Sequence, residues 1–224
     1  MIGSQSSASQ SVQFWSPEAP ELGCVLKDYP REMNHGPTAN FVTGELIACY
    51  ENTCEIYDNG EWNHLVDTTT RRIFHSSAVN ENKILLIGGT SGSSTEWISK
   101  DGSPSQPGPF QVRNGYTHCT IQVTDNVILV TGGYNTESYV TQYQLPVKGS
   151  ETPRNPMKQP RRYHACGVYQ NAGGQKVRML CGVFPHFFFK FDFSPNTDTQ
   201  VLLVTGGFSP SRSSYIDSTE VGLY

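Results

Sequence analysis

Short apolar runs that end in glycine recur along the chain. A continuous apolar run of about four residues, bounded by turn signals, is typical of a strand buried on both faces. The adjacent glycines allow positive φ and close backbone approach where such a strand ends. The runs and the glycine pairs that follow them are ILLI at 84–87 with Gly88 and Gly89, VILV at 127–130 with Gly132 and Gly133, and VLLV at 201–204 with Gly206 and Gly207.

A polar loop and a second strand-like segment follow the apolar runs. These segments are TCEIYDNGEW at 53–62, STEWIS at 94–99 and YVTQYQL at 139–145. They alternate enough to predict outer strands, and Asn59-Gly60 is a hairpin signal inside the first of them. The 21 Gly, 14 Pro and 11% aromatic residues agree with short strands joined by many turns. The pattern therefore predicts an all-β fold.

Histidines mark the start of four similar segments of the chain. They are His35, His75, His118 and His164, spaced 40, 43 and 46 residues apart. A period near 45 residues indicates a repeat architecture. We expect repeats at about 20–68, 69–110, 111–155 and 156–224 within a repeat region 14–224, after a disordered Ser/Gln-rich lead at 1–13. The first repeat has Ala48-Cys49 where the next two have Gly-Gly.

An arginine precedes each histidine within five positions, as Arg31, Arg72, Arg113 and Arg162. With the Gly-Gly strand and the later Glu-aromatic or Tyr-Asp segment, this pattern resembles the kelch repeat family over about residues 20–224. The resemblance implies a kelch-type β-propeller in which each repeat is a four-stranded blade. About four blades are present, and the propeller is incomplete as written because family members usually have six or seven. Tryptophans are missing from the later fourth strands, which departs from the family pattern.

The fourth repeat is interrupted by residues 177–200, a phenylalanine-rich stretch without strand or helix period. Deleting these 24 residues restores the distance from His164 to the Gly-Gly strand, in frame. Codons for Lys176-Val177-Arg178 and for Gln200 can spell splice signals. We therefore favour a retained intron or gene-model error over a true inserted loop, which would expose a large apolar patch or need a partner to cover it.

Charge and hydropathy exclude two classes of partner. The net charge is -4, and the 16 Lys and Arg are scattered, so we expect no nucleic-acid binding. No apolar run reaches the roughly 18 residues that span a bilayer, so we expect no transmembrane segment. The N-terminus lacks the apolar centre of a signal peptide. Cytoplasmic and extracellular locations both remain open.

The recurring histidines are best interpreted as structural. A residue at the same offset in every repeat is more typical of packing than of one active site. The flanking arginines are expected to bond carbonyls or acids between blades. The six cysteines form no C-x-x-C pair and have no histidine at metal-ligand spacing, so we predict no metal site, no catalytic residues and no cofactor.

Two cysteine pairs are candidates for disulfides. Cys49 and Cys54 flank a short turn and make a plausible local pair. Cys119 and Cys166 follow the histidines of neighbouring repeats but lie one residue out of phase, so buried free thiols are favoured there over a disulfide.

The resemblance and the polar loops together favour a non-catalytic binding module for an unidentified protein partner. The alternative is a fragment of a propeller enzyme such as the galactose oxidase-like copper radical oxidases. That chemistry needs a tyrosine cross-linked to a cysteine together with further Tyr and His copper ligands. The sequence does not gather such a set recognisably, and no BTB-like helical segment precedes the repeats.

Overall fold

The computed structural model describes residues 12–16, 19–31, 38–113, 115–146, 151–169, 201–205, 208–209, 214–215 and 219–223. Its strands are β1 (Val12–Ser16), β2 (Ala19–Leu26), β3 (Thr38–Val42), β4 (Glu45–Asp58), β5 (Glu61–Arg72), β6 (Ser76–Asn80), β7 (Lys83–Ile87), β8 (Ser94–Ser99) and β9 (Gln106–Gln111). They continue as β10 (Cys119–Thr124), β11 (Val127–Thr131), β12 (Val140–Gln144), β13 (Glu151–Pro153), β14 (Ala165–Tyr169), β15 (Val201–Thr205), β16 (Phe208–Ser209), β17 (Ser214–Tyr215) and β18 (Thr219–Leu223). The all-β prediction is confirmed.

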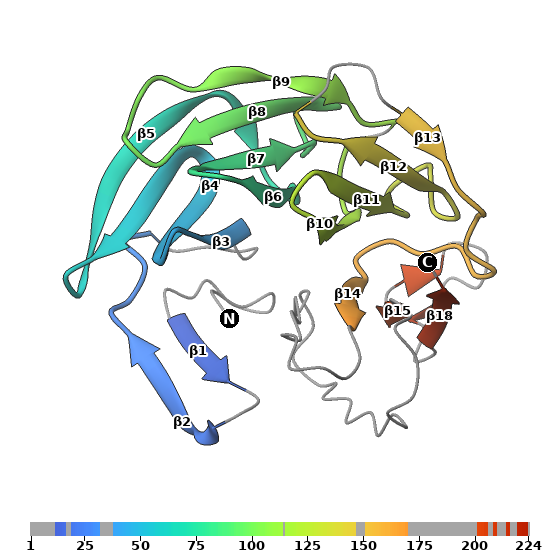
Figure 1. Ribbon diagram of the computed structural model, residues 1–224, viewed down its shortest axis with the longest axis horizontal. Coiled ribbons are helices and arrows are strands. Elements are labelled where there is room, and N and C mark those ends of the chain that lie inside the picture. The colour runs from blue at the N-terminus through green and yellow to red at the C-terminus, as the bar shows by residue number, and fades with distance from the viewer. Residues whose placement is uncertain are drawn as a thin grey trace.

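Four antiparallel sheets follow one another along the chain. The first is β3-β4-β5, the second β6-β7-β8-β9, the third β10-β11-β12-β13 and the fourth β14-β15-β18. The pairs β1-β2 and β16-β17 form separate two-stranded sheets. Figure 1 shows the four sheets side by side along an arc, with β3, β6, β10 and β14 on its inner side and β5, β9 and β13 on its outer side. The inner strands of consecutive sheets contact one another.

Apolar side chains of the central strands fill the joints between these sheets. On β7, Leu85 and Ile87 belong to a core cluster shared with the third sheet, whereas Ile84 and Leu86 belong to one shared with the first. On β11, Val130 faces the second sheet and Leu129 packs with Cys166 of β14. Successive side chains of a strand point to opposite faces, so the prediction of burial on both sides is confirmed for the runs in β7 and β11. The side chains of the run 201–204 lie outside the described ones.

The first sheet has an unusual central strand. β3 pairs with the first half of β4, and β5 pairs with the second half. The Cα atoms of Cys49 and Cys54, both in β4, are 4.1 Å apart. Five steps along an extended strand would cover about 16 Å, so β4 turns sharply back between these two cysteines.

In the first repeat, the residues that correspond to the glycine pairs of later repeats are not the expected ones. Gly88 and Gly132 stand five residues after the first residues of β7 and β11, so Tyr50 is their counterpart on β4. The expected counterpart, Ala48-Cys49, is wrong by two residues because the hairpin register, and not the distance from His35, sets the position. Glu51, the counterpart of the second glycine, has a φ of 56°, a region that glycine adopts far more easily.

The fourth sheet joins strands that are far apart in sequence. β14 pairs with β15 from Ala165 opposite Thr205 to Tyr169 opposite Val201. VLLV is therefore the second strand of the fourth repeat, at the place that the repeat pattern assigns to it. The stretch 177–200 lies outside the described residues, as does the lead 1–13 apart from Val12 and Gln13 at the start of β1.

Candidate functional site

The described anchor histidines are buried, and His118 and His164 lie at joints between sheets. His118 and His164 are only 7% and 5% exposed, and both ring nitrogens of His75 are buried. His164 Nε2 shares a hydrogen bond of 2.8 Å with Thr131 Oγ1, at the end of the preceding sheet's central strand. His164 therefore packs the fourth repeat onto the third sheet, and His75 and His118 are buried in the same way. His35 lies outside the described residues.

Burial also keeps the histidine rings neutral. Desolvation, with a smaller contribution from Arg72, lowers the pKa of His75 to about 3. Desolvation lowers the pKa of His118 to about 4, and desolvation with a contribution from Arg161 lowers the pKa of His164 to about 3. Neutral rings at pH 7 suit a packing role at a joint between sheets.

The glycine pairs leave room for the histidine of the next repeat. A Cβ on Gly88 would lie 2.8 Å from Cε1 of His118, and a Cβ on Gly132 would lie 2.6 Å from Cε1 of His164. The amide of Gly133 donates a 3.1 Å hydrogen bond to the Arg161 carbonyl, which links the third repeat to the fourth. Gly206 and Gly207 are outside the part of the chain that the structure describes.

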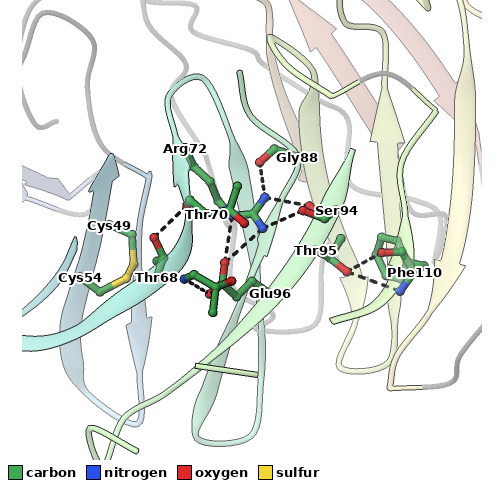
Figure 2. Close-up of polar contacts among 11 residues, drawn as sticks. Cys49, Cys54, Thr68, Thr70, Arg72, Gly88, Ser94, Thr95, Glu96 and Phe110 are labelled. Atoms are coloured by element: carbon green, nitrogen blue, oxygen red, sulfur yellow. Dashed lines mark hydrogen bonds and ion pairs between the residues drawn. A yellow bond between two sulfur atoms is a disulfide. The ribbon is translucent and has the colours of Figure 1, made fainter. Parts of the chain in front are cut away.

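Arg72 carries a buried ionic network between the first and second sheets (Figure 2). Its guanidinium pairs with the Glu96 carboxylate at 3.2 Å, and both side chains are 2% exposed. Its Nη1 also donates to the carbonyls of Gly88 at 2.7 Å and Ser94 at 2.8 Å. The other Glu96 oxygen accepts from the amide of Thr69 at 2.6 Å. These contacts run from the first sheet to the second, as expected for an arginine that bonds carbonyls and an acid between blades, although all of these residues belong to the same sequence repeat.

Two other flanking arginines also pair with acids of the next sheet. Arg31 lies 3.2 Å from Glu55, whose pKa is raised by burial. Arg113 lies 2.7 Å from Glu151 at the surface. The fourth repeat differs, because Arg161 and not Arg162 is fully buried there. Arg161 precedes His164 by three residues, as Arg72 precedes His75. This shared spacing is the sequence signal that identifies the buried arginine of these two repeats.

Both candidate cysteine pairs are disulfides. Cys49 and Cys54 are bonded across the turn in β4, and Cys119 is bonded to Cys166 with a Cα–Cα distance of 6.1 Å. The expectation of free thiols at Cys119 and Cys166 is therefore wrong. The two cysteines lie on β10 and β14, which are neighbouring inner strands, and both face the core between the third and fourth sheets. The position of each cysteine relative to its repeat's histidine did not predict the face of the strand on which its side chain lies.

Aromatic side chains that the sequence did not single out gather at one end of the sheets. We call Phe74, Tyr116, Tyr134, Tyr163 and Arg162 the aromatic patch. Phe74 and Tyr163 make an edge contact with centroids 5.4 Å apart, and Tyr116 stacks on Tyr134 at 4.9 Å. The Arg162 guanidinium lies 5.3 Å from the Tyr134 ring centre and 6.0 Å from that of Tyr163.

The backbone holds this patch in a strained arrangement. Phe74, Thr117 and Tyr163 directly precede the three histidines, and their φ angles are 60°, 62° and 53°. The amide of Thr117 donates to the Phe74 carbonyl at 3.1 Å, and the amide of Tyr163 donates to the Thr117 carbonyl at 3.0 Å. Non-glycine residues with positive φ persist only where the surroundings impose them, and they cluster at functional sites.

The patch reaches solvent through the loop between β11 and β12. Tyr134 and Tyr139 are 38% and 49% exposed, and they are the exposed large hydrophobic side chains among those described. Arg113 lies over the Tyr139 ring at 6.0 Å, as Arg162 does over Tyr134. Desolvation, followed by electrostatic interaction with Tyr134 and Tyr163, raises the pKa of the Tyr116 hydroxyl above its usual value.

The first sheet carries a hollow away from the aromatic patch. It has a volume of about 550 Å³ and is lined by Glu45, Ile56, Asp58, Asn59, Glu61 and Asn63. Lys100 pairs with Glu45 at 2.6 Å, and Lys27 pairs with Glu61. These lysines offset much of the hollow's negative charge.

Within the described ranges, no three His, Cys, Asp or Glu side chains are grouped so that they could hold a metal ion. The described part of the chain also contains no helix long and apolar enough to cross a bilayer. No family model matches the chain, and no curated protein matches it.

Proposed function

We propose that the chain is a kelch-type β-propeller, with about four blades as written, that acts as a non-catalytic binding module for a protein partner. Several observations support the propeller. Consecutive antiparallel sheets stand along an arc with their first strands innermost. The glycine pair of one repeat packs against the histidine of the next at two successive joints. Radial repetition of such sheets is the propeller architecture.

The aromatic patch carries the binding proposal. Its residues come from the loops that precede β6, β10 and β14 and from the loop that follows β11. In the register of β10 and β11, Cys119 is opposite Thr131, so these loops meet at the same end of the sheets. Tyrosine and arginine are enriched among residues that dominate protein interfaces, and rings held in place lose little entropy on binding.

Chemistry within the described side chains favours binding over the copper oxidase alternative. The four cysteines whose side chains are described form two disulfides with one another. None of these four is therefore cross-linked to a tyrosine, as copper radical chemistry requires.

The experiment places a photo-cross-linking amino acid at Tyr134 and, as a matched control, at Asn59 in the turn beside the hollow of the first sheet. We expect Tyr134 to cross-link a defined protein that Asn59 does not. The purified partner should then bind the Tyr134→Ala variant at least tenfold more weakly, and Tyr134→Phe close to normally. Equal cross-linking from both sites, or unchanged affinity of Tyr134→Ala, would refute the patch. One copper per chain with radical absorption would favour the enzyme.

A further inference from the structure

The Cys119–Cys166 disulfide is a covalent cross-link between two sheets that share no backbone ladder. β10 belongs to the third sheet and β14 to the fourth. The joint is also held by the chain segment between β13 and β14 and by an apolar cluster that includes Leu129 and Met157. Hydrogen bonds add to it, such as the one from the Tyr163 amide to the Thr117 carbonyl and the one between His164 and Thr131. Cys49–Cys54, by contrast, lies within β4 and joins no two sheets.

The same joint divides the aromatic patch. Tyr116 and Tyr134 flank strands of the third sheet, whereas Arg162 and Tyr163 lead into β14. Cys119 follows Tyr116 by three residues, and Cys166 follows Tyr163 by three residues. The contact of Arg162 with Tyr134 therefore depends on how the two sheets are held together.

We propose that the Cys119–Cys166 disulfide is a redox lock on the aromatic patch. The oxidised protein holds the two halves of the patch together, and reduction lets the fourth sheet separate from the third and weakens partner binding. The effect on partner binding rests on the proposed binding function, whereas the effect on the joint does not.

The Cys119–Cys166 disulfide is the less buried of the two, and we therefore expect it to be reduced faster. Cys49 and Cys54 are 1% and 0% exposed, and Cys166 is 3% exposed. Cys119 is only partly buried. Thiol–disulfide exchange requires access of a thiolate to one sulfur, and we expect that access at Cys119, the least buried of the four cysteines.

The reductant is a dithiol, and the exchange proceeds in two steps. One thiolate of the dithiol attacks Sγ of Cys119 and forms a mixed disulfide, while the Cys166 sulfur leaves as a thiolate and takes up a proton. The second thiol of the reductant then attacks its own sulfur in the mixed disulfide and releases Cys119 as a thiol. Two electrons and two protons pass from the dithiol to the protein, and the dithiol ends as a disulfide.

The first measurement follows reduction of the wild-type protein by dithiothreitol, with alkylation of new thiols read by mass spectrometry. We expect Cys119 and Cys166 to be alkylated at least tenfold faster than Cys49 and Cys54. Amide hydrogen exchange of residues 163–169 should accelerate at least tenfold on reduction and return on reoxidation. Equal reduction rates of the two disulfides, or unchanged exchange at 163–169, would overturn the lock.

The second measurement uses paired variants in the oxidised state. Cys119→Ser with Cys166→Ser should show the fast exchange at 163–169 permanently, and Cys49→Ser with Cys54→Ser should leave exchange there unchanged. If the first double variant does not fold, the reversible change in the wild-type protein decides the question. Faster exchange without weaker binding of the cross-linked partner would contradict control of binding while leaving the mechanical joint supported. If no partner is captured at Tyr134, the proposed function fails independently of the lock.

Discussion

Replacement of Gly132 by alanine tests the close packing between the third and fourth sheets. Gly132 has a φ of 59°. A Cβ there would meet the Arg161 carbonyl oxygen at 2.4 Å and Cε1 of His164 at 2.6 Å. Neither group can retreat easily, because the carbonyl is backbone and His164 is buried. The substitution should therefore push two sheets apart.

The expected loss has two parts. An alanine in the left-handed region costs about 1 kcal/mol, and overpacking of a well-packed core costs typically 1–3 kcal/mol. We expect Gly132→Ala to lower the free energy of unfolding by about 2–4 kcal/mol. Gly44 is the matched control, because its φ is 97° and a Cβ there would meet nothing within 4 Å. Gly44→Ala should therefore cost only the backbone strain, about 1 kcal/mol.

Urea unfolding followed by tryptophan fluorescence would measure both variants at pH 7. Each kcal/mol should also lower the melting temperature by about 2–4 °C in a chain of this size. If the two variants differ by less than about 0.5 kcal/mol, the reasoning about contact between glycine and histidine at the joint is refuted.

Two further predictions concern buried charge. Glu96→Gln leaves the Arg72 guanidinium buried without its carboxylate, and we expect it to lower the free energy of unfolding in urea by about 3–5 kcal/mol. The control, Glu151→Gln, breaks a largely exposed pair with Arg113 and should cost under about 1 kcal/mol. Equal losses for the two variants would contradict the burial argument. The lowered histidine pKa values mean that the folded state binds fewer protons than the unfolded state between pH 6.5 and about 4. Stability should therefore be full above pH 6.5 and fall as the pH decreases through that window, by about 1.4 kcal/mol per pH unit for each buried histidine. His118→Gln should reduce this slope measurably in unfolding experiments between pH 4.5 and 7.5, and an unchanged slope would argue against a neutral buried ring.

Local sequence patterns predict the strands, their buried faces and their ends. The apolar runs of β7 and β11 identify strands buried on both faces, because side chains alternate along a strand and both sides must then be covered. The glycines that follow them mark strand ends, since the backbone there takes positive φ. Arg72 could also be recognised as an acid or carbonyl partner, because a charge inside a sheet protein requires one.

Only the tertiary structure decided how the repeats meet. It placed Tyr50 and Glu51 at the glycine position of the first repeat through the hairpin register of β3 and β4. It also bonded Cys119 to Cys166, although 47 residues separate them in sequence.

The aromatic patch is the extreme case, because Phe74 and Tyr163 come from the second and fourth repeats and touch only once the sheets are side by side. Periodicity and turn chemistry are properties of neighbouring residues in the chain, so the sequence determines strands and their buried faces. Which residues meet across the joints depends on the packing of one sheet against the next, and short-range patterns rarely specify those pairs.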